Sequence, residues 1–105
     1  MAYWILATYT RPNTDVAWFS PSDEVTAKVN EYKDSDPAKI THYEVKESGD
    51  QLKQYIKVGF VDQAESLNFL AEDDIQNNES ARQSYIDSNP TTVLIEDKEE
   101  EEPTI

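Results

Sequence analysis

Residues 39 to 61 read KITHYEVKESGDQLKQYIKVGFV, and this stretch decides the fold class. Two segments rich in β-branched and aromatic residues, 39–47 and 51–61, lie on either side of Gly49 and Asp50. Such segments joined by a short loop that contains glycine are typical of a β-hairpin. The sequence therefore predicts an antiparallel hairpin in the middle of the chain.

The pairing register of this hairpin decides which of its side chains are buried. A two-residue loop with glycine first favours a type II′ turn, which would place Tyr43 opposite Ile56. One face of the hairpin would then hold Tyr43, Val45, Leu52, Ile56, Val58 and Phe60, and the other His42, Glu44, Lys46, Lys53, Tyr55 and Lys57. A slip by one residue would exchange the two faces. Glu47 and Gln54 are the polar exceptions on the apolar face. A three-residue loop would set Lys46 opposite Leu52 on the buried face, so the two-residue turn is favoured.

Other elements flank the hairpin on both sides. We expect a strand over 2–10, a helix beginning near Ser20 with Pro21 as its first residue, a helix over 62–87 interrupted within 72–78, and a short strand over 91–96. The order β-α-β-β-α-β resembles the ferredoxin-like arrangement. The predicted fold class is α+β, a ferredoxin-like βαββαβ plait whose antiparallel sheet carries two helices on one face.

The net charge of -13, from 22 acidic and 9 basic residues, is unevenly distributed. Residues 96–105 hold six acidic residues and one lysine, whereas the aromatic residues lie upstream. Runs of like charge without apolar residues are commonly disordered. We therefore expect one folded domain over 2–96 and a disordered acidic tail over 97–105.

Composition also narrows the classes of function. There is no cysteine and a single histidine, and two glycines are too few for a phosphate-binding loop, so we expect no metal, no cofactor and no nameable catalytic residue. No apolar run approaches the roughly 20 residues of a membrane span, and the amino-terminal segment lacks the basic start of a signal peptide. We expect a cytoplasmic protein without membrane contact, and the negative charge disfavours direct nucleic-acid binding.

The acidic balance instead favours a non-enzymatic interaction or regulatory module. A compact negative protein can be steered electrostatically to a basic partner surface. In charge the chain is similar to the small acidic nucleic-acid mimics found among phage accessory proteins. Our first hypothesis is an acidic module of that kind, which binds a basic protein.

The first strand predicts an assembly, because it is apolar on both faces. Tyr3, Ile5 and Tyr9 alternate with Trp4 and Leu6. One layer of helices covers one face of a sheet, and large exposed apolar patches usually mark interfaces. We therefore expect a homodimer, with Trp4, Leu6, Tyr55 and Leu94 as interface candidates.

The alternative hypothesis is a dimeric α+β-barrel enzyme or small-molecule binder with a pocket at the sheet face. His42, Tyr43 and Tyr55 are its first pocket candidates. A binding site of this class needs an enclosed apolar pocket with a few convergent polar groups, which an interaction module does not need. A cavity therefore discriminates between the two hypotheses.

Overall fold

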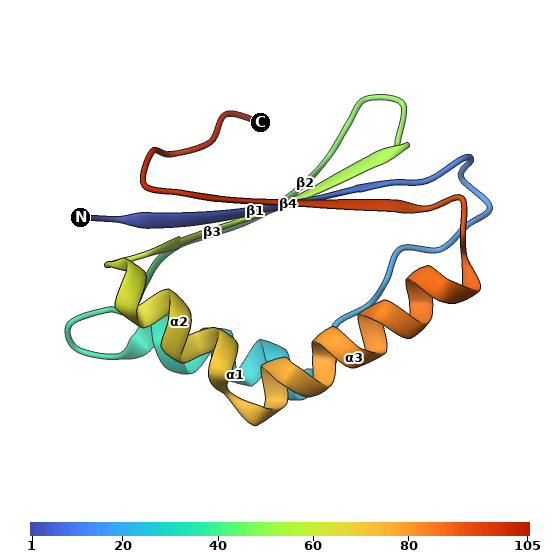
Figure 1. Cartoon of the computed structure of the whole chain (residues 1–105). Coiled ribbons are helices and arrows are strands. Elements are labelled where there is room, and N and C mark those ends of the chain that lie inside the picture. The colour runs from blue at the N-terminus through green and yellow to red at the C-terminus, as the bar shows by residue number, and fades with distance from the viewer.

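A computed structural model describes residues 1–105 and shows an antiparallel sheet with all the helices on one of its faces (Figure 1). The strands are β1 (Tyr3–Thr10), β2 (Ile40–Glu47), β3 (Lys53–Phe60) and β4 (Val93–Glu99), in the order β2-β3-β1-β4. The helices are α1 (Asp23–Asp34), α2 (Gln63–Ala71) and α3 (Asp73–Ser88). The predicted ferredoxin-like α+β fold is confirmed. None of the helices has the length and apolar character needed to cross a membrane.

The central strand β1 has two buried faces, as its sequence indicates. Ile5 and Tyr9 face the helices, whereas Trp4 and Leu6 lie on the opposite face because successive side chains of a strand alternate. All four side chains are at most 9% exposed. We call the sheet face without helices the open face.

The hairpin register differs from the expected one. Tyr43 pairs with Val58, not with Ile56, so the register is offset by two residues. The reason is a longer loop: the Ser48 amide donates to the Lys53 carbonyl at 2.9 Å, and Gln51, not Gly49, has a positive φ of 61°. An offset of two residues preserves the alternation, so the predicted division into an apolar and a polar face survives.

Helix α1 begins later than expected. Ser22, not Ser20, is its N-cap, and the Ser22 hydroxyl accepts a hydrogen bond from the Val25 amide at 3.4 Å. Pro21 therefore precedes the helix and lies with Phe19 in the connecting loop. The buried residues of α1 pack with the sheet, α2 and α3 in one core: Val25, Val29, Tyr32, Ile5, Ile40, Phe60, Phe69 and Ile75.

The predicted interruption of the second helix is a single residue, Glu72, which lies in extended conformation between α2 and α3. Asp62 caps α2 as its spacing predicts, accepting from the Glu65 amide at 2.9 Å. The Glu72 carboxylate accepts a hydrogen bond from the Tyr32 hydroxyl at 3.1 Å and lies 3.4 Å from Lys28. These contacts attach the break between α2 and α3 to α1.

The carboxyl-terminal segment follows a different course from the one expected. Strand β4 includes residues 97–99, which we expected in a disordered tail. Residues 100–105 then turn back across the open face (Figure 1). Here Glu102 pairs with Lys57 at 2.9 Å, and the Lys57 ammonium lies 5.2 Å from the centre of the Trp4 ring. The buried lysine thus provides an anchor for the acidic segment.

Candidate functional site

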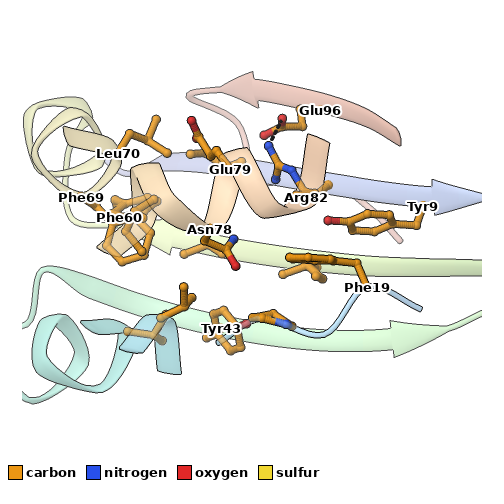
Figure 2. A pocket seen from close by; sticks show the side chains of 18 residues that line it. Tyr9, Phe19, Tyr43, Phe60, Phe69, Leu70, Asn78, Glu79, Arg82 and Glu96 are labelled. Carbon is orange, nitrogen blue, oxygen red and sulfur yellow. Dashed lines mark hydrogen bonds and ion pairs between the residues drawn. The ribbon is translucent and has the colours of Figure 1, made fainter. Parts of the chain in front are cut away.

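A cavity of about 110 Å³ lies between the sheet and the helices (Figure 2). Of its 18 lining residues, 13 are hydrophobic. Strand alternation brings Ile5, Ala7 and Tyr9 of β1 to the same wall. The loop before α1 contributes Phe19 and Pro21, which close one side. The cavity is therefore built largely from the face of β1 that meets the helices.

One face of α3 supplies most of the polar groups of the cavity. Ile75, Asn78, Glu79 and Arg82 have the spacing i, i+3, i+4 and i+7, which places them on one side of a helix. An apolar helix face would be typical of a core position, but three of these four residues are polar. The sequence of α3 thus places hydrogen-bonding groups against an otherwise apolar wall.

Arg82 is held at the cavity by an ion pair between α3 and β4. Its Nη2 donates to Glu96 Oε1 at 2.9 Å. The Arg82 side chain is 18% exposed and that of Glu96 is 31% exposed, so water has limited access to the pair. Figure 2 shows this pair on the same side of the cavity as Tyr9. The arrangement places the fixed guanidinium of Arg82 near the hydroxyl of Tyr9.

The two tyrosines of the cavity stay protonated near neutral pH. Burial raises the pKa of Tyr9, and the nearby Arg82 guanidinium opposes part of that effect. Burial also raises the pKa of Tyr43. Both hydroxyls can therefore donate a hydrogen bond, and neither provides a basic phenolate. The carboxyl groups among the lining residues are those of Glu79 and Glu96.

The loop over 11–22 is fastened to the body beside the cavity. The Tyr85 hydroxyl donates to the Ala17 carbonyl at 2.6 Å, and the rings of Phe19 and Tyr85 lie 5.7 Å apart. Trp18 donates its indole N–H to Glu47 at 2.9 Å. These contacts position Phe19 as a wall of the cavity.

Of the three predicted pocket residues, only Tyr43 lines the cavity. His42 and Tyr55 have the opposite parity in their strands and lie on the open face. His42 lies 3.2 Å from Glu44, and its ring stands edge-on to Trp4 at 5.7 Å. The alternative hypothesis places the pocket at the sheet face of a dimeric α+β barrel, whereas the cavity lies on the helix side of the sheet within a single chain.

The interface candidates are also divided by the sheet. Trp4, Leu6 and Tyr55 lie on the open face, but Leu94 pairs with Tyr9 and shares its orientation toward the helices. The apolar residues that β4 leaves exposed are Val93 and Ile95, at 51% and 56%. Our expectation placed Leu94 on the wrong face because the pairing of β4 with β1 cannot be read from the β4 sequence.

Sequence reasoning missed the polar residues of the cavity: Tyr9, Asn78, Glu79, Arg82 and Glu96. The available signal was the helical spacing within 75–82. We expected an interruption over 72–78 and began the second helical piece at 79. Because the predicted helix began at residue 79, Asn78 and Arg82 were not recognised as lying on one face of a helix.

No protein-family model and no curated protein sequence matches the chain. Its fold does resemble solved structures. One is a proposed antibiotic biosynthesis monooxygenase from Deinococcus radiodurans, with a TM-score of 0.60 and 14% identity, covering 98% of this chain and 95% of that one. Another is SnoaB, a cofactor-independent oxygenase from Streptomyces nogalater, with a TM-score of 0.57 and 10% identity, covering 99% and 96%. A third, a dimeric ferredoxin-like protein from an uncultured marine organism, has a TM-score of 0.51 and 7% identity, covering 92% of each chain.

These similarities, together with the cavity, overturn our first hypothesis of a non-enzymatic acidic module of the phage accessory type. The solved structures that match nearly the whole chain include proteins described as monooxygenases or as an oxygenase. They favour the alternative of an enzyme or small-molecule binder. The net charge did not predict the function, because acidic residues on the exposed surface do not indicate whether an apolar cavity lies beneath it.

Proposed function

We propose that the protein is an enzyme that binds a small aromatic molecule with an acidic hydroxyl in the cavity between the sheet and the helices. The observation that supports this most is the pairing of apolar walls with a single fixed cation, Arg82. Apolar pockets with a few placed polar groups are typical of small-molecule sites. The volume suits one aromatic ring, since an engineered cavity of roughly 150 Å³ binds benzene.

The polar groups suggest how a phenol would be held. Arg82 would stabilise the oxygen as it becomes a phenolate, because a cation in an apolar site interacts strongly with a developing negative charge. Tyr9 stays protonated and would donate a second hydrogen bond. Glu79 or Glu96 would accept the phenolic proton.

The proposed reaction is cofactor-independent oxygenation, by analogy with the description of SnoaB. A phenolate is electron-rich, so dioxygen can oxidise it once the proton has left. One oxygen atom would become a carbonyl oxygen at the ring carbon para to the hydroxyl. The other would leave as water with the para hydrogen and the phenolic hydrogen, giving a quinone. Arg82 and Tyr9 would hydrogen-bond to the original phenolic oxygen throughout the reaction.

Binding and chemistry are tested separately. Titration with phenol, benzene and cyclohexanol, followed by amide chemical shifts, should show phenol bound most tightly, with the largest shifts near Ala7 and Arg82. No phenol binding, or shifts confined to the open face, would reject the proposed site. Dioxygen uptake with 3-methoxyphenol, whose para position is free, tests the reaction. Binding without uptake would reject the oxygenase assignment and leave a binding protein.

We also propose that two copies associate through the open face. Val93 and Ile95 expose apolar surface there, and Tyr55 lies on the same side. One of the structurally similar proteins is described as dimeric, which supports this proposal. The cytoplasmic location stays a prediction.

A further inference from the structure

Asn78 carries an unpaired polar atom beside the cavity. Its side-chain oxygen Oδ1 is buried and has no hydrogen-bond partner. Figure 2 shows the Asn78 side chain projecting from α3 toward the space between Phe60 and Phe19. Buried polar groups of native proteins are nearly always hydrogen-bonded, so an orphaned acceptor at a cavity requires an explanation.

The neighbouring donors do not supply the missing partner. Arg82 donates to Glu96, and neither the Tyr9 nor the Tyr43 hydroxyl makes a hydrogen bond to the Asn78 oxygen. The Asn78 oxygen therefore loses its hydration without compensation, which destabilises the empty protein. A ligand with a suitably placed donor would remove that cost.

We propose that Asn78 is a recognition residue that accepts a hydrogen bond from a second donor on the ligand. This inference rests on the proposed function and narrows its substrate class. The ligand is an aromatic ring with an acidic hydroxyl at Arg82 and a second hydroxyl or N–H at Asn78. A ring with a single polar substituent leaves the Asn78 oxygen unpaired.

The spacing on α3 fits such a ligand. Asn78 and Arg82 are four residues apart, and residues at this helical spacing have Cβ atoms about 5–6 Å apart. That distance is of the order of the separation between two substituents across a benzene ring. Most of the other lining residues are hydrophobic, with Phe19 and Tyr43 among them. A single ring can therefore reach both polar groups.

Matched pairs of ligands test this inference. Resorcinol and hydroquinone are each titrated calorimetrically against their monomethyl ethers, without oxygen to prevent oxidation. Each ether keeps one hydroxyl for Arg82 and loses the second donor. We expect at least one diol to bind about three- to tenfold more tightly than its ether, the gain of one neutral hydrogen bond.

The variant Asn78→Leu assigns this preference to Asn78, with Asn77→Leu as the control. Asn77 is exposed and does not line the cavity. We expect Asn78→Leu to abolish the preference for the diol and to raise the melting temperature of the ligand-free protein, because an unpaired acceptor is removed. Asn77→Leu should keep the preference.

The outcomes separate the two proposals. If neither phenol nor the diols bind, the proposed function is wrong. If phenol binds but the diols show no preference over their ethers, or the preference survives in Asn78→Leu, the role of Asn78 is overturned and the proposed site stands.

Discussion

The guanidinium of Arg82 on α3 lies 2.9 Å from the carboxylate of Glu96 on β4, and both side chains border the cavity. The ion pair joins a helix to an edge strand. It also fixes the orientation of the Arg82 guanidinium, which we propose binds the hydroxyl oxygen of the ligand. The position of Arg82 is therefore set by both α3 and β4, one in the helix layer and the other in the sheet.

Replacing Arg82 with glutamine should weaken phenol binding while leaving the binding of benzene unchanged. Hydrogen bonds to charged groups are worth about 1.5–3 kcal/mol, so we expect phenol affinity to fall by roughly 10- to 100-fold. Titration calorimetry measures the change, and Lys33→Gln on the exposed side of α1 is the control. Equal loss of benzene and phenol affinity would indicate a collapsed cavity, not a lost cation.

Gly59 should tolerate no side chain, because the Trp4 ring lies directly over it. A Cβ at position 59 would come within 2.6 Å of the Trp4 ring, whereas a Cβ at Gly49 would meet no atom within 4 Å. We expect Gly59→Ala to lower the free energy of unfolding by about 1–3 kcal/mol, the usual cost of overpacking. Gly49→Ala should change it far less. Similar urea midpoints for the two variants would contradict the close contact between Trp4 and Gly59.

The contact between Glu102 and Lys57 predicts a pH dependence of stability. The hydrogen bond from Lys57 lowers the pKa of Glu102 below its ordinary value of 4.5. The stabilisation is therefore fully present above pH 4.5 and is lost as the pH falls through the lowered pKa. Glu102→Gln should lower the melting temperature at neutral pH, and its difference from the unmodified protein should shrink in acid. Glu101→Gln, one residue away, is the control, and equal effects would contradict a specific contact.

The proposed dimer predicts opposite effects of two lysine substitutions. Ile95→Lys should yield monomers, because Ile95 is exposed on the open face. Val45→Lys should not, because Val45 is equally exposed near the hairpin end but belongs to the helix side of the sheet. Light scattering at high micromolar concentration distinguishes the two states. A monomeric unmodified protein would rule the dimer out.

The fold could be predicted because alternation and capping are local properties. The two-faced pattern of 3–9 identified the central strand, and Asp62 identified the start of α2. The register could not be predicted, because Gln51 adopts the left-handed conformation that the sequence suggested for Gly49. The face assignments survived only because the register is offset by two residues.

The site was largely unpredictable for a different reason. Glu96 and Arg82 meet through tertiary packing, and the pairing of Leu94 with Tyr9 depends on a register that β4 alone does not specify. Tyr43 was predicted as a pocket residue, but with His42 and Tyr55, which lie on the opposite face. The path of residues 100–105 depends on Lys57, whose burial was not evident from its position on a polar face.

The most direct test of the central claim is a crystal of the protein soaked with 4-iodophenol, with the iodine located by anomalous diffraction. Our account predicts iodine inside the cavity between the sheet and the helices, with the phenolic oxygen at Arg82. Iodine on the open face would contradict it. So would an empty cavity in crystals soaked at a concentration of 4-iodophenol that saturates the protein in solution.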